Sequence, residues 1–108
     1  MVRDELLRRR VGAEAAAATL ARDLEALFAA SRDSNADDEH DPEGATIGFE
    51  RAQLTALLAA ARQRITEVDD ALGRIDAGTY GRCEHCGRPI AADRLDARPF
   101  ARRCIACA

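Results

Sequence analysis

Residues 83–86 read Cys-Glu-His-Cys and residues 104–107 read Cys-Ile-Ala-Cys, and these two stretches contain all four cysteines of the chain. A CxxC turn brings two sulfur atoms toward one metal ion, and two such turns complete a tetrahedron of thiolates around zinc. The seventeen residues between the two pairs match the spacing expected of such sites. Gly87 follows the first pair, where a tight turn needs an unhindered backbone. We predict one structural Zn²⁺ ion, with the ligands Cys83, Cys86, Cys104 and Cys107.

Other uses of four cysteines are free thiols, a redox pair or two disulfides. Redox CxxC motifs usually stand singly at the start of a helix after a strand, and the chain has no strand-helix-strand pattern. His85 could replace a sulfur ligand, but it lies between two better ligands. Four thiolates leave the ion no open position for a substrate, which favours a structural over a catalytic zinc. The only two serines, Ser31 and Ser34, have no nearby histidine or GxSxG context, so we expect no enzyme.

Upstream of the cysteines the chain is patterned for two long helices. Apolar residues recur in steps of three and four from Asp4 to about Ala30, and again from Ile47 to Ile75, which is typical of helices that pack along one seam. The predicted seam residues are Leu6, Ala13, Ala17, Leu20, Leu24 and Leu27, then Ile47, Leu54, Leu58, Ala61, Ile65, Val68, Leu72 and Ile75. Gly78 is a suitable C-cap for the second helix.

These patterns predict an all-α fold in which a long antiparallel coiled-coil helical hairpin, residues 1–77, precedes a small C4-type zinc finger, residues 78–108. Turn-forming residues gather between the helices, and we place the tip of the hairpin at about residues 31–45. Pro42 disfavours helix just before it and Gly44 weakens helix just after it. Six acidic residues lie in the tip, and it is either a solvated loop or an element that contacts a partner: Asp33, Asp37, Asp38, Glu39, Asp41 and Glu43.

The charge is distributed unevenly along the chain, whose formal net charge is −3. Residues 1–72 carry 9 basic and 15 acidic side chains, whereas residues 73–108 carry 7 and 4. An acidic hairpin does not suit the phosphate backbone of DNA, which argues against direct sequence-specific DNA binding. Four arginines form a modest basic face in the finger: Arg94, Arg98, Arg102 and Arg103. They are either solvated charges that Asp93 and Asp96 balance or a surface that docks on an acidic protein. No stretch approaches the apolar length of a membrane span, so we expect a cytoplasmic protein without membrane contact.

The finger has a more specific signature than its cysteines alone. The run Tyr-Gly-Arg-Cys-Glu-His-Cys-Gly at residues 80–87, then Ile90, then Arg-Leu-Asp-Ala-Arg-Pro at residues 94–99, and the second CxxC pair closely resemble the zinc finger of the DksA/TraR family. The resemblance covers residues 47–107 well and residues 1–46 in architecture only. It implies a regulator of bacterial transcription that binds RNA polymerase. The helical hairpin of such proteins enters the secondary channel of the polymerase, and its acidic tip approaches the catalytic centre.

The resemblance is weaker at the tip. Well-studied members carry Asp-x-x-Asp-x-Ala there, and a gapless count back from Cys83 puts His40, Glu43 and Ala45 on those positions. A shift by one residue puts Asp41 on the first acid instead. The resemblance therefore implies Asp41, Glu43 and Ala45 as partner-binding residues. Several members act with the alarmone ppGpp. The chain ends one residue after Cys107, without the C-terminal helix of longer members. The resemblance therefore supports ppGpp binding less strongly than it supports polymerase binding.

Two other functions are compatible with the sequence. The arginine-bearing finger could belong to a zinc-ribbon protein that binds nucleic acid. Alternatively, apolar residues outside the seam, such as Phe49 and Leu57, could make the chain a coiled-coil adaptor that dimerises. We expect a monomer that binds RNA polymerase.

Overall fold

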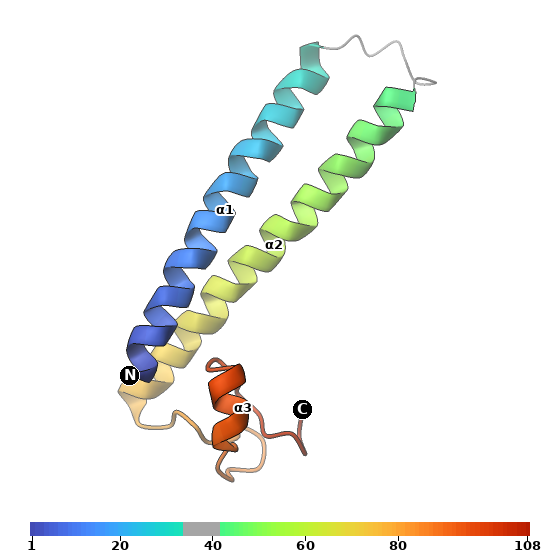
Figure 1. Cartoon of the computed structure of the whole chain (residues 1–108). Coiled ribbons are helices and arrows are strands. Elements are labelled where there is room, and N and C mark those ends of the chain that lie inside the picture. Colours follow the sequence, from blue (N-terminus) through green and yellow to red (C-terminus); the bar gives the residue numbers. More distant parts are fainter. Residues whose placement is uncertain (34–41) are drawn as a thin grey trace. The chain divides into compact units, whose positions relative to one another are not determined.

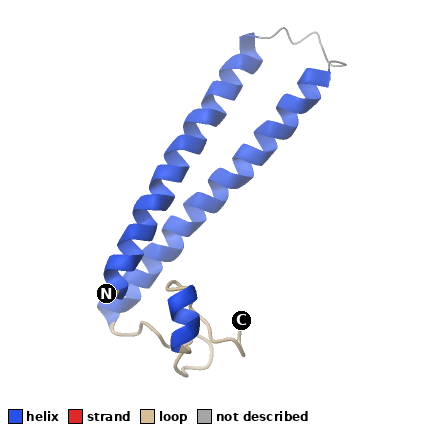
Figure 2. Ribbon diagram, viewed as in Figure 1, coloured by secondary structure: helices blue, strands red, loops and turns tan. Residues whose placement is uncertain are grey.

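The structure is a computed structural model, and it describes residues 1–33 and 42–108. These ranges contain three helices: α1 (Val2–Asp33), α2 (Pro42–Ala77) and α3 (Ala92–Ala97) (Figure 1). They contain no strand (Figure 2). A single antiparallel bridge pairs Arg82 with Pro89. The predicted all-α fold, with two long helices that pack together ahead of a four-cysteine cluster, is confirmed. No helix in the described ranges is long and apolar enough to cross a membrane.

Both long helices extend further toward the predicted tip than the sequence analysis expected. Helix α1 continues through Asp33, and α2 already begins at Pro42. Proline is well tolerated in the first turn of a helix, because the N–H that it lacks would have no partner there and its φ angle is already helical. Gly44 lowers helix propensity by only about 1 kcal/mol relative to alanine, too little to stop a helix of 36 residues. The segment that was predicted as the tip, at about residues 31–45, therefore includes the end of α1 and the first turn of α2.

The C-terminus of α2 lies where the sequence predicts it. Gly78 has a positive φ angle of 77°, which an L-residue with a side chain rarely adopts. The N–H of Thr79 donates to the carbonyl of Arg74, 2.9 Å, and the N–H of Gly78 donates to the carbonyl of Ile75, 3.1 Å. This pair of hydrogen bonds is a Schellman motif, and it turns the chain out of the helix into the cysteine-containing segment.

The chain divides into two compact units. The finger unit comprises Met1–Gly12 and Arg64–Ala108, and the hairpin unit comprises Ala13–Gln63. In both units α1 and α2 run antiparallel with the same register. Arg3 pairs with Asp76 and Arg10 with Asp69 in the finger unit, and in the hairpin unit the guanidinium of Arg51 lies 5.8 Å from the ring centroid of Phe28. The two residue numbers of each pair total 79.

The predicted seam is correct along both helices, because each of its residues is buried or half-buried. Leu6 and Val68 are fully buried in the finger unit, where they form the core with Ala71 and Phe100. In the hairpin unit Ala13 and Leu58 are the buried members of the seam, and the others are half-buried. The two charged residues that interrupt the pattern stay partly or wholly at the surface: Arg10 is half-buried and Arg51 is exposed.

Candidate metal centre

The first cysteine pair lies in a tight turn that backbone hydrogen bonds hold in place. The N–H of Gly87 donates to the carbonyl of Cys83, 2.9 Å, and the N–H of Cys83 donates to the carbonyl of Arg88, 2.8 Å. Gly87 has a φ angle of 74°, so the prediction that this position needs an unhindered backbone is confirmed. The turn therefore brings the sulfurs of Cys83 and Cys86 close together.

Backbone hydrogen bonds link the second cysteine turn to the first. The N–H of Cys107 donates to the carbonyl of Cys104, 3.0 Å, which closes the second turn. The N–H of Glu84 donates to the carbonyl of Arg102, 2.9 Å, and so ties the two turns together. The N–H of Ile90 donates to the carbonyl of Gly81, 2.7 Å, and Ile90 is buried beneath the first turn.

The four cysteine sulfurs converge on one point. All four lie within 4.8 Å of one another, and the sulfurs of Cys86 and Cys104 are 3.7 Å apart. In a tetrahedral site with Zn–S bonds of about 2.3 Å, neighbouring sulfurs are about 3.8 Å apart, so the cluster already has the dimensions of a zinc site. All four cysteines are free of disulfide bonds. Cys83 is buried whereas Cys86 is exposed, so one side of the cluster faces solvent.

The electrostatics of the cluster favour a cation. Backbone N–H groups, above all that of Cys104, lower the pKa of the Cys83 thiol to about 6. The thiol of Cys107 is crowded by the other sulfurs, first by its hydrogen bond with Cys104, and its pKa rises to about 12. A divalent cation placed among the sulfurs would remove the cause of this rise, because it stabilises every thiolate at once. The donor set therefore fits one soft metal ion.

The other predicted site residues lie elsewhere. His85 is exposed at the surface of the first turn. His40 and Asp41 fall outside the described residues, and Glu43 and Ala45 belong to the first turn of α2, where only the backbone is described. The acidic tip therefore stays a prediction.

The arginines of the finger have other partners than the sequence suggested. Nε of Arg103 lies 3.2 Å from Oε1 of Glu84, and Nη1 of Arg102 lies 4.0 Å from Oδ2 of Asp70. Asp93 and Asp96 lie on the short helix α3, which the sequence analysis did not anticipate, and the charge balance expected of them stays a prediction.

Phe100 anchors the finger to the helices of its own unit, a role that the sequence analysis missed. Its ring belongs to the core cluster with Leu6, Val68 and Ala71, and the guanidinium of Arg64 lies 4.5 Å from its centroid. Its carbonyl accepts a hydrogen bond from Arg74, 3.2 Å. The one available signal was an isolated aromatic residue in a finger with few other large apolar side chains.

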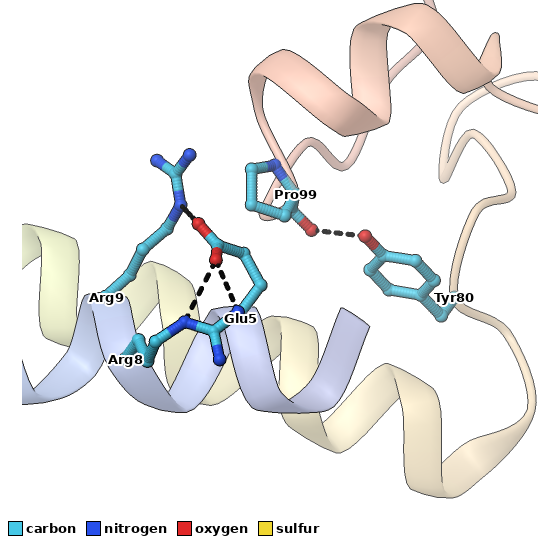
Figure 3. Close-up of polar contacts among 5 residues, drawn as sticks. All are labelled: Glu5, Arg8, Arg9, Tyr80 and Pro99. Atoms are coloured by element: carbon cyan, nitrogen blue, oxygen red, sulfur yellow. Dashed lines mark hydrogen bonds and ion pairs between the residues drawn. The ribbon is translucent and has the colours of Figure 1, made fainter. Parts of the chain in front are cut away.

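Figure 3 shows two further sets of polar contacts in the finger unit, one at Tyr80 and one at Glu5. The hydroxyl of Tyr80 donates to the carbonyl of Pro99, 2.7 Å, and thereby connects the start of the finger to the residue before Phe100. Burial raises the pKa of Tyr80, which keeps the hydroxyl protonated as a donor. On α1, Glu5 pairs with Arg8 and Arg9, and these hydrogen bonds lower the pKa of its carboxyl group.

Comparison with known proteins assigns the metal centre to a family. Residues 78–108 match the model of the prokaryotic dksA/traR C4-type zinc finger. The chain carries a DksA/TraR zinc finger. The family resemblance and the predicted C4 zinc finger are thereby confirmed, and the matched segment includes all four cysteines of the cluster.

Relatives of this DksA/TraR finger protein extend the likeness beyond the finger. The RNA polymerase-binding transcription factor DksA of Caulobacter vibrioides is 50% identical over 40 residues, which cover 37% of this chain and 28% of the relative. General stress protein 16O of Bacillus subtilis is 35% identical over 72 residues, 67% of this chain and 44% of the relative. The chain thus spans less than half the length of these two curated relatives.

A solved structure matches nearly the whole chain. Transcription factor DksA2 from Pseudomonas aeruginosa superposes with a TM-score of 0.79 and 29% sequence identity. The match covers 98% of this chain and 76% of that one. The likeness therefore includes the helical segments, which the family model of the finger does not cover.

Proposed function

We propose that this protein is a non-enzymatic regulator of bacterial transcription that binds RNA polymerase through its secondary channel. The observation that carries the proposal is the likeness of 98% of the chain to a transcription factor at a TM-score of 0.79. The Caulobacter vibrioides relative is an RNA polymerase-binding transcription factor, which supports RNA polymerase as the partner. The acidic composition of residues 33–43 supports an approach of this segment to the catalytic centre of the polymerase, as the family resemblance implies.

The zinc ion has a structural role in this proposal. Four protein thiolates fill a tetrahedral coordination shell, so no position is open for a substrate or an activated water. What the ion supplies when bound is a cross-link between two turns. The finger needs that cross-link because few of its described residues are buried, and Phe100, one of them, packs against the helices; the buried residues are Cys83, Ile90, Pro99, Phe100 and Ala101.

Binding to purified core RNA polymerase tests the partner. The wild-type, zinc-loaded protein should bind the polymerase and compete with other secondary-channel factors such as those of the Gre family. Absence of binding would remove the proposed function and leave the fold untouched. A salt-sensitive gel shift with DNA in place of polymerase binding would favour the nucleic-acid alternative, and a concentration-dependent dimer mass would favour the adaptor.

A tip variant tests the mechanism. We expect Asp41→Asn with Glu43→Gln to keep the helix signal, the zinc content and polymerase binding within about threefold, while the effect on transcription falls about tenfold or more, because charged contacts near the catalytic centre are lost. The matched control is Asp23→Asn with Glu25→Gln, two exposed acids on α1 with the same change in charge. Equal loss of regulation in both variants would show that net charge, rather than the tip, is responsible.

A further inference from the structure

The finger contains an apolar groove outside the cysteine cluster. The groove has a volume of about 540 Å³ and lies between α3 and the second cysteine turn. Its apolar wall includes Ala91, Ala97, Ile105 and Ala106. Ile105 is 83% exposed, although it is one of the few large aliphatic side chains of the finger. A single exposed isoleucine is ordinary on a protein surface, but one that lines a concave apolar groove is positioned to bury its side chain against a partner.

Two arginines line the same groove. Arg94 belongs to α3, and Arg98 is the residue that caps its C-terminus, where the N–H of Arg98 donates to the carbonyl of Arg94, 2.7 Å. Neither forms an ion pair with a carboxylate among residues 1–33 and 42–108. Nε of Arg94 donates to the carbonyl of Arg103, 2.9 Å, which holds this guanidinium in a fixed orientation. Asp93 also lines the groove, four residues before Ala97 on α3.

The net charge of the finger also favours an acidic ligand. Residues 78–108 contain six arginines and three acidic residues. An acidic group on a partner would therefore meet a favourable potential at this groove, and the arginine pair would fix where the group binds. The apolar wall distinguishes the expected ligand from a nucleic acid, because a phosphate backbone has no apolar side chain to bury there.

We infer that this groove binds a protein segment that places an apolar side chain against Ile105 and a carboxylate beside Arg94 and Arg98. The inference rests on the proposed function in one respect, since the partner that carries the segment is taken to be RNA polymerase. It adds a second contact surface, distinct from the acidic tip, on the finger itself. Cys104 belongs to the groove wall, so the metal-bound turn keeps Ile105 in position.

The test measures the affinity of full-length, zinc-loaded variants for purified core RNA polymerase. Ile105→Gln keeps the size of the side chain and removes its apolar character, and we expect it to weaken binding about tenfold, as the loss of a buried aliphatic side chain does. Its control is Val11→Gln, on an α1 residue that is 67% exposed and far from this groove in sequence. Arg98→Glu should weaken binding about tenfold or more, and the effect should shrink at high salt.

Arg88→Glu is the control for charge, because Arg88 is an exposed finger arginine that does not line the groove. Zinc content and melting temperature must match the wild type in every variant compared. The inference is overturned if Ile105→Gln binds within about twofold of the wild type, whatever the arginine variant does. Equal weakening by Arg88→Glu and Arg98→Glu would also overturn it, since the effect would then be general charge attraction.

The design separates this inference from the proposed function. If the wild type binds the polymerase and the Ile105 variant binds equally well, the function stands and the groove has no part in it. If the wild type does not bind, both fail together. Self-association of the wild type that Ile105→Gln abolishes would assign the groove to a second copy of this chain and contradict the inference.

Discussion

The finger unit and the hairpin unit share two helices and one register, yet they differ in how their side chains pack. In the finger unit Leu6 and Val68 have no exposed surface, and Ala71 and Phe100 close the core around them. In the hairpin unit the buried residues are Ala13 and Leu58, and the other leucines of the seam are half-buried. Burial of apolar surface is therefore concentrated in the finger unit, where the finger adds a third side to the helix pair.

The difference shows two ways to stabilise the same pair of helices. Alanines occupy residues 15–18 of α1 within the hairpin unit, and alanine has the highest helix propensity of all residues. Helix formation there depends on local propensity more than on packing, since a half-buried alanine or leucine removes little apolar surface from water. The finger unit instead depends on tertiary contacts, and those contacts depend on the fold of the finger.

The largest effect should follow from loss of the metal. We expect Cys83→Ser to lose zinc and to unfold residues 78–108, because binding of structural zinc contributes free energy on the order of 10 kcal/mol in small fingers. Hydrogen exchange reports this directly. The amides of Cys83 and Ile90, which donate to the carbonyls of Arg88 and Gly81, should lose protection, whereas amides of the hairpin unit should keep theirs.

His85→Ser is the matched control for this variant, because His85 lies in the same turn and is exposed. It should keep one zinc per chain and the same protection pattern. Loss of zinc in the histidine variant would make His85 a ligand. Equal loss of protection in both units after removal of zinc would mean that the hairpin unit also depends on the metal, and the contrast between the units would not hold.

A leucine-to-alanine pair on α1 should give the next largest effect. Leu6→Ala removes a fully buried side chain from the finger unit and should cost about 2–4 kcal/mol in the free energy of unfolding. Leu24→Ala makes the same change at a half-buried position of the hairpin unit and should cost about 1 kcal/mol. Urea denaturation followed by circular dichroism compares the two. Equal costs would refute the view that packing is concentrated in the finger unit.

The sequence predicted those features that depend on local chemistry. The seam residues follow from the periodicity of the apolar residues. The positive φ angles at Gly78 and Gly87 follow from the ability of glycine to adopt them without a steric cost. The convergence of four sulfurs follows from the geometry of two CxxC turns. Each of these signals lies within a few residues of the feature that it predicts, apart from the pairing of the two turns.

The features that the sequence analysis missed depend on contacts between distant residues. Phe100 is buried because it meets Leu6 and Val68, which are far from it in the chain. Helix α3 has six residues, too few for a periodic pattern or for stability on its own, and packing within the finger maintains it. The start of α2 at Pro42 was missed for another reason: Pro42 and Gly44 were counted among the turn-forming residues of the tip, although proline is favoured in the first turn of a helix.

The smallest effect should come from an ion pair between the helices of the finger unit. Nε of Arg10 lies 2.6 Å from Oδ1 of Asp69, and this hydrogen bond lowers the pKa of the Asp69 carboxyl group. A carboxyl group with a lowered pKa in the folded state stabilises the fold at neutral pH, and this contribution is lost as the pH falls below about 4. Protons also displace zinc from thiolates in acid, so ionic strength is the cleaner variable.

Asp69→Asn should therefore cost about 0.5 kcal/mol at neutral pH and low salt, a value kept small because both side chains are partly exposed and screened by water. At about 1 M salt the cost should fall by half or more, because the screening length becomes shorter than the spacing of most surface charges. The control is Asp23→Asn in the hairpin unit, whose exposed carboxylate forms no ion pair within residues 1–33 and 42–108. It should change the melting temperature little at either salt concentration. A cost at Asp69 that does not depend on salt would mean that the residue acts through packing or helix propensity, and that charge contributes nothing measurable to the stability of the finger unit.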